Sequence, residues 1–251
     1  MKRIVATLTT LFFFATSTEA QLLKKVLGNK DSGITQKEAQ LLNKVIGKPT
    51  TTGLSQQDIA SGLKAALNQG IEKGTSLLSA TDGFFGNAAV KILLPPEATQ
   101  VETTLRRIGM GKQVDEAILT MNRAAESAAK EALPIFKDAI TGISFADAMQ
   151  ILRGGDTAAT GYLRGNTQQS LSNAFRPVIE KALENTGATK HWNTIFSNYN
   201  RVSLKKVNPD LTGYVTERAL QGLFLQVAEE EKKIRKDPLA RGSDILKKVF
   251  G

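Results

Sequence analysis

Apolar residues recur at helical spacing from Thr212 to Lys236, over the longest uninterrupted pattern of this kind in the chain. The main positions of this stripe are Leu220, Leu223, Val227 and Ile234. Such a wide stripe is typical of an amphipathic helix that packs against a hydrophobic core. Asp237-Pro238 predicts the end of the helix, because the residue before a proline disfavours helical conformation.

Charged residues near the end of this stretch raise a question about one carboxylate. Glu230 lies on the apolar stripe, so we consider two interpretations. It is a carboxylate at the rim of the core that pairs with a basic residue from elsewhere, or a buried acid with a raised pKa, as often found at functional sites. Glu231 and Arg235 have the spacing of an ion pair along the helix surface, which contributes a few tenths of a kcal/mol.

Small residues mark a second predicted helix. Ser55 and Asp58 have the spacing of a capping box at its start. Every fourth residue of one face is small, and the set is Gly62, Ala66, Gly70 and Gly74. Because an interior glycine destabilises a helix by about 1 kcal/mol relative to alanine, we expect close contact with another helix. The alanine-rich second half of the helix predicted from Gln113 to Leu133 is the expected partner.

The remaining patterns are also helical. Ser144 and Asp156 are predicted N-caps, Thr167 to Thr186 is a predicted helix that Pro177 kinks or splits, and Asp82 to Asn87 is a loop that directs two phenylalanines inward. Trp192, Phe196 and Tyr199 form an aromatic stripe typical of a core. We therefore predict an all-α protein, a single compact multi-helix domain with short amphipathic helices at both ends of the mature chain.

Polar residues one turn apart interrupt the helix from Gln113 to Leu133. Asn122 and Glu126 have this spacing, and Arg123 with Ser127 repeats it beside them. The pattern indicates a buried polar network, with a ligand-facing patch as the alternative. Together with Glu230 and Arg235, the residues Asn122, Arg123 and Glu126 are our candidates for a ligand site or a polar network.

The first twenty residues have the composition of a secretory signal. Lys2-Arg3 precede an apolar run, and small residues flank Glu19. We expect residues 1–20 to be removed, residues 21–48 to form a basic amphipathic segment and residues 49–251 to form the helical domain. No cysteine is present, so disulfides and lipid attachment to a cysteine are excluded. The expected location is the periplasm or envelope of a bacterium.

Basic residues gather toward the two ends of the chain. Residues 21–48 have a net charge of +4 and residues 232–251 a net charge of +5, whereas residues 49–231 sum to −1. Three similar heptapeptides lie in the basic parts, at residues 22–28, 41–47 and 245–251. Each would form a short helix with apolar residues on one side and lysines on the other. They either cover the core or bind an anionic surface, through Lys24, Lys25, Lys44, Lys247 and Lys248.

Several kinds of chemistry lack their motifs. The lone His191 has no partner at metal-ligand spacing, and the loop Arg153-Gly154-Gly155 lacks the lysine and spacing of a phosphate loop. The chain has no G-x-S-x-G nucleophile motif and no second histidine, so nothing supports hydrolysis by a nucleophilic side chain. The sequence thus predicts no metal and no cofactor.

Motifs spread along the chain carry a resemblance. They are Gly53-Leu54-Ser55, Asp82 to Asn87, Met121 to Glu126, Tyr214-Val215-Thr216, Gly222-Leu223-Phe224, Glu229 to Glu231, Ile234-Arg235, Asp237-Pro238 and Leu246 to Gly251. In this combination, from about Gly53 to Gly251, the chain resembles the bacterial domain-of-unknown-function family 4197. The resemblance implies an exported helical envelope protein and supplies no catalytic residues.

Two functions from different classes fit these observations. The favoured hypothesis is a non-catalytic periplasmic protein that binds a partner or an amphiphilic ligand. The candidate binding partners are an anionic membrane surface and an acidic protein of the envelope. The alternative is an envelope hydrolase that uses Glu126 and Glu230, which would then have to meet in one cleft. Nucleic acid is not an expected partner, because no recognition motif accompanies the basic charge.

Overall fold

The computed structural model describes residues 55–202, 206, 208 and 210–237. The chain divides into two units after Gly53, and every described residue belongs to the second unit. All regular elements of the described residues are helices, which confirms the all-α prediction. The predicted signal peptide and the three heptapeptides, with their five lysines, lie outside the described residues.

The described helices differ widely in length. The elements are α3 (Gln56–Ser79), the 3-10 helix η1 (Pro96–Ala98), α4 (Thr99–Arg107), α5 (Gly111–Ala129), α6 (Ala132–Thr141), α7 (Phe145–Arg153), α8 (Ala158–Asn185), α9 (Ala188–Val202) and α10 (Leu211–Lys236). The segment predicted as one helix from Gln113 to Leu133 is divided between α5 and α6.

The longest described helix is α8, with 28 residues against 26 in α10. Two predictions are corrected, because α8 begins well before Thr167 and Pro177 does not split it into two helices. The prediction began too late because Gly161 and Gly165 weaken the helical pattern in the first turns. Neither glycine has an atom of another element where a β-carbon would lie.

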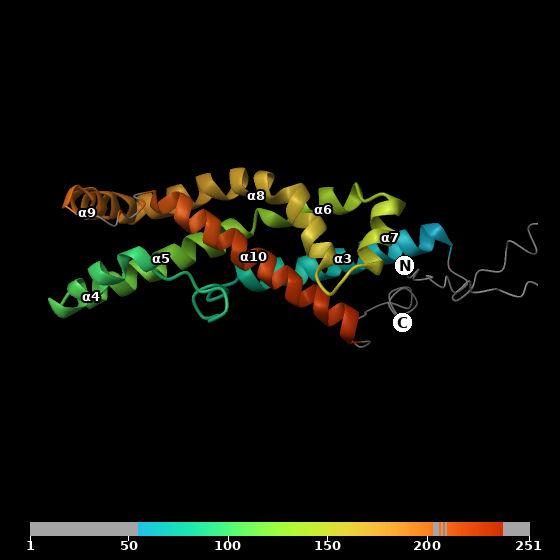
Figure 1. Cartoon of the computed structure of the whole chain (residues 1–251), viewed down its shortest axis with the longest axis horizontal. Coiled ribbons are helices and arrows are strands. Elements are labelled where there is room, and N and C mark those ends of the chain that lie inside the picture. Colours follow the sequence, from blue (N-terminus) through green and yellow to red (C-terminus); the bar gives the residue numbers. More distant parts are fainter. Residues whose placement is uncertain (1–54, 203–205, 207, 209, 238–251) are drawn as a thin grey trace, which may run out of the picture. The chain divides into compact units, whose positions relative to one another are not determined.

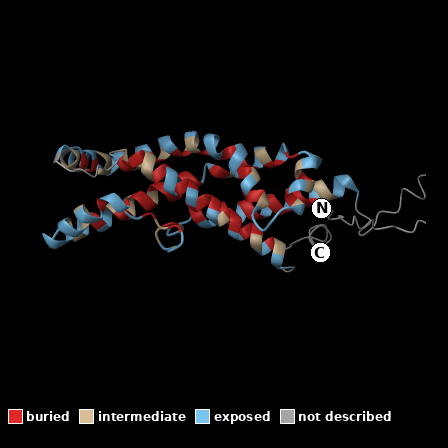
Figure 2. Ribbon diagram, in the orientation of Figure 1, coloured by how far each residue is buried: buried red, intermediate tan, exposed pale blue. Residues whose placement is uncertain are grey.

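Helix α10 has the central position in the packing. It contacts α8, α3, α5 and α9, and it runs diagonally across the bundle in Figure 1. Its predicted apolar stripe is buried, as are the facing sides of α3, α5 and α8 (Figure 2). Asp210 caps its first turn, since its carboxylate accepts a hydrogen bond from the Gly213 amide at 2.8 Å.

The small-residue face of α3 packs against a different helix from the one predicted. A β-carbon on Gly70 would lie 3.4 Å from the Ile234 side chain, and one on Gly74 would lie 3.5 Å from that of Gln226. Both contacts belong to α10, which runs antiparallel to α3. At Gly70 and Gly74 the prediction that the alanine-rich part of α5 is the partner is therefore corrected, because long side chains of α10 fill the space there.

Other local predictions divide into confirmed and corrected ones. Ser55 and Ser144 both form capping boxes, with Asp58 and Asp147 respectively. Trp192 and Phe196 are buried core residues, as the aromatic stripe predicts. Asp156 is not an N-cap. It forms an exposed ion pair with Lys236 at 2.7 Å, and a carboxylate of α10 caps α8 in its place.

Gly222 of α10 is required by a close approach of the loop that follows α3. A β-carbon there would lie 2.8 Å from the Phe84 ring and 3.1 Å from Val90. Because Phe84 is fully buried, we expect Gly222→Val to lower the free energy of unfolding by about 1–3 kcal/mol. Urea denaturation measures this change.

The same substitution at an open position provides the control. A β-carbon on Gly165 of α8 has no atom of another element within 4 Å. We therefore expect Gly165→Val to change the free energy of unfolding by no more than about 0.5 kcal/mol. Equal destabilisation by the two variants would show that the loss of glycine itself, and not the contact with Phe84, causes the effect.

Candidate functional site

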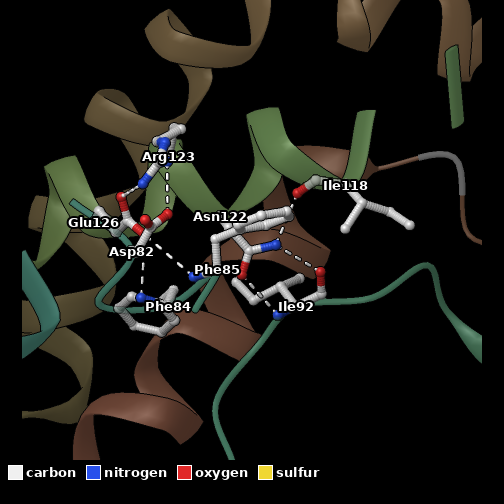
Figure 3. A network of polar contacts seen from close by, with 8 residues as sticks. All are labelled: Asp82, Phe84, Phe85, Ile92, Ile118, Asn122, Arg123 and Glu126. Atoms are coloured by element: carbon white, nitrogen blue, oxygen red, sulfur yellow. Dashed lines mark hydrogen bonds and ion pairs between the residues drawn. The ribbon is translucent and has the colours of Figure 1, made fainter. Parts of the chain in front are cut away.

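The polar residues predicted on α5 hold the segment that follows α3. Asn122 is fully buried, and its side-chain oxygen accepts a hydrogen bond from the Ile92 amide at 2.8 Å (Figure 3). Its side-chain nitrogen donates to the Ile92 carbonyl at 2.8 Å and to the Ile118 carbonyl at 2.7 Å. One amide side chain thus satisfies both backbone groups of Ile92, as the neighbouring strand of a sheet would do.

Glu126 holds the preceding turn in a similar way. One carboxylate oxygen accepts hydrogen bonds from the Phe84 and Phe85 amides, both at 3.1 Å. The other oxygen accepts from Arg123 at 2.6 Å, and only 4% of Glu126 is exposed. Arg123 also pairs with Asp82 at 2.7 Å, and its hydrogen bonds to Glu126 and Asp82 raise its pKa above the usual value.

The two phenylalanines of this turn differ in environment. Phe84 is buried against α10, whereas Phe85 is half-buried beneath Lys91, whose ammonium lies 3.9 Å from the ring centroid. The prediction that both rings point inward is therefore confirmed for Phe84, and confirmed in part for Phe85, which packs against the core but is only half-buried. A cation over the ring face stabilises Phe85 where water still reaches it.

Glu230 pairs with basic residues, as the first interpretation predicts, but it is buried. It is 2% exposed and pairs with Lys73 of α3 at 3.2 Å, as well as with Lys233 at 2.7 Å. Gln226 donates a further hydrogen bond at 3.2 Å. A basic residue from another helix does pair with it, but the carboxylate lies inside the packing between α3 and α10 and not at a rim.

Glu231 and Arg235 form a joint between three helices. The Glu231 carboxylate accepts hydrogen bonds from the Ala159 amide at 3.0 Å and from the Thr160 amide at 2.8 Å. Arg235 contacts this carboxylate at 2.9 Å and donates to the Ile151 carbonyl of α7 at 2.8 Å. An anion at the start of α8 and a cation at the end of α7 both complement the helix dipoles.

The predicted ion pair between Glu231 and Arg235 is confirmed, but its predicted place on the helix surface is corrected. Only 7% of the residue is exposed. A signal was available, because Glu231 lies four residues after Val227 and three before Ile234, which places it on the buried stripe. The pattern could not show that the start of α8 lacks a side-chain cap of its own, since Thr157 provides none.

The candidate residues form separate groups. Asn122, Arg123 and Glu126 share one network, whereas Glu230 and Arg235 belong to the contacts of α10. Glu126 and Glu230 have no hydrogen-bond partner in common among the described residues. The hydrolase alternative stays a prediction, and none of these contacts favours it.

The described residues offer no group of three or more His, Cys, Asp or Glu side chains that could hold a metal ion. In the same part of the chain, no helix combines the length and the apolar character needed to cross a membrane. Apart from five threonines, the buried polar residues of the described part are Asn122, Glu126, Glu230 and Glu231. Each of these four bonds to an element that is distant in sequence.

Comparison with known proteins identifies the family. No curated protein and no solved structure matches the chain significantly. The family model described as "Protein of unknown function (DUF4197)" matches residues 53–251, which include all helices of the structure and both polar networks. The chain therefore belongs to the DUF4197 family.

Proposed function

We propose that this protein is a non-catalytic component of the bacterial cell envelope, and that its basic ends bind an anionic membrane surface. The observation that carries the proposal is the distribution of charge along the chain. Residues 55–237 contain 22 basic and 20 acidic residues, whereas residues 21–54 carry a net charge of +4 and residues 238–251 a net charge of +2. The helical bundle is nearly neutral, and the excess positive charge belongs to the parts that carry the heptapeptides.

The contacts of the buried carboxylates support a non-catalytic role. Glu126 accepts hydrogen bonds from two backbone amides and forms an ion pair with Arg123, and Glu230 forms ion pairs with two lysines. A general acid or base exchanges a proton with the substrate, so the substrate must be able to reach its carboxyl group. These carboxylates instead stabilise loop and helix contacts within the bundle.

Amphipathic basic helices bind membranes through two contributions. Their apolar side enters the lipid interface, and each lysine near an anionic surface contributes on the order of 1 kcal/mol. The heptapeptides provide five lysines, Lys24, Lys25, Lys44, Lys247 and Lys248. Because salt screens the charge contribution, binding should weaken as the ionic strength rises.

Vesicle co-sedimentation tests the proposal. We expect a chain beginning at Gln21 to pellet with vesicles of phosphatidylglycerol and phosphatidylcholine, and to stay in solution with phosphatidylcholine alone. Replacing the five heptapeptide lysines by glutamine should lower the apparent affinity at least about 100-fold, since each contributes on the order of 1 kcal/mol.

A charge-matched variant provides the control. Glutamine replaces five exposed bundle lysines, Lys112, Lys130, Lys181, Lys190 and Lys206, so the net charge falls by the same amount. We expect this variant to bind almost as the parent does. Equal pelleting with both kinds of vesicle, no pelleting with either, or equal losses in the two variants would contradict the proposal.

A further inference from the structure

Helices α6 and α8 leave an open groove of about 420 Å³ between them. This volume lies in the range of sites that bind small molecules. The groove is separate from the polar networks described above, and it has no part in the membrane contact proposed for the two ends. Its main lining residues are Ile135, Asp138, Ala139, Tyr162, Asn166 and Ser170.

The aromatic residue of the groove is held in place. Tyr162 is half-buried, and its hydroxyl lies near the Asp147 carboxylate of α7. Burial, together with this aspartate, raises the pKa of Tyr162 above its usual value. The ring lines the groove together with Ile135 and Ala139, and it provides an apolar surface there.

The polar side chains of the groove offer mainly acceptors. Asp138 is exposed and forms no ion pair with another described residue. Asn166 donates its amide nitrogen to the Tyr162 carbonyl at 2.8 Å, which leaves its side-chain oxygen to accept. None of the lining residues is a lysine or arginine, which disfavours a phosphate or another anion.

We propose that the groove between α6 and α8 binds a saccharide. A sugar ring combines many hydroxyl donors with an apolar face of C–H groups, so it matches acceptors arranged around an aromatic side chain. The C–H face lies against Tyr162, and the hydroxyl groups donate to Asp138, Asn166 and Ser170. This inference goes beyond the proposed function, because membrane binding by the ends does not require it.

Titration of the ¹⁵N-labelled protein with chitotriose, cellotriose and maltotriose tests this site. We expect at least one of them to shift the amide resonances of Ala139, Tyr162 and Ser170. Asp138→Asn should weaken that binding about tenfold, because the acceptor loses its charge and one of its two accepting oxygens. Tyr162→Phe should bind within about twofold of the parent, since it keeps the ring and loses only a hydroxyl that lies near Asp147.

Glu116→Gln provides the matched control, because this exposed carboxylate of α5 lies outside the groove. It should leave the affinity unchanged. Three results would each overturn the proposal: no shifts with any of the three sugars, shifts confined to other helices, or equal affinity of Asp138→Asn and the parent. Displacement of the bound sugar by trilysine at equal concentration would also contradict it, since it would indicate a site for cations.

Discussion

Glu231→Ala is expected to lower the free energy of unfolding by about 3–5 kcal/mol, the largest effect we predict for one side chain. Two losses combine in this variant. The amides of Ala159 and Thr160 lose their acceptor at the start of α8, and the mostly buried Arg235 loses this carboxylate from among its partners. Because one partner of a buried pair remains, the cost exceeds that of losing an exposed ion pair. Urea denaturation of the protein measures the difference.

Two further variants separate the contributions. Glu229→Ala removes a carboxylate two positions away, which forms only a half-exposed pair with Lys232, and should cost less than about 1 kcal/mol. Glu231→Gln keeps one side-chain acceptor for α8 but loses the charge, so it should lie between the two alanine variants. If Glu231→Ala and Glu229→Ala cost the same, the joint between α7, α8 and α10 is not a major source of stability.

The fold class followed from the sequence because it depends on periodicity along one segment at a time. The stripe of α10, the capping boxes at Ser55 and Ser144, and the buried Trp192 and Phe196 are all local patterns. Each needs only the identity of residues within a few turns of helix. The structure confirms all of these local predictions.

The choice of partners between helices did not follow in the same way. Gly70 and Gly74 were correctly predicted to lie at a close contact, but the contact is made by Gln226, Glu230 and Ile234 of α10. A row of small residues shows that space is available, and it does not show which side chains fill that space. The alanine-rich half of α5 and the long side chains of α10 were equally compatible with the pattern.

The polar candidates show the same limit. Asn122 and Glu126 were correctly predicted as a buried network from their spacing and the apolar residues around them. Their partners are backbone groups of Phe84, Phe85 and Ile92, about 30 to 40 positions earlier in the chain. Backbone groups carry no sequence signal, so the loop that this network holds could not be identified from residue types.

Asn122→Leu is expected to lower the free energy of unfolding by about 2–4 kcal/mol, although leucine has a similar volume and is apolar. The reason is that the two backbone groups of Ile92 stay buried after the side chain that bonds to both of them is lost. An unsatisfied buried donor or acceptor costs about 1–3 kcal/mol, and burial of an apolar side chain offsets part of the two costs. Thermal and urea denaturation give the total change.

Hydrogen exchange locates the effect, because the Ile92 amide should exchange much faster in Asn122→Leu while amides in the centre of α8 keep their relative order of protection. Asn173→Leu is the matched control, since this asparagine is exposed on α8 and bonds only to Gln169 within the same helix. It should change the free energy of unfolding by no more than about 0.5 kcal/mol. If Asn122→Leu proved as stable as the parent, apolar packing between α5 and the extended segment would hold Ile92 in place, and the amide network would be dispensable.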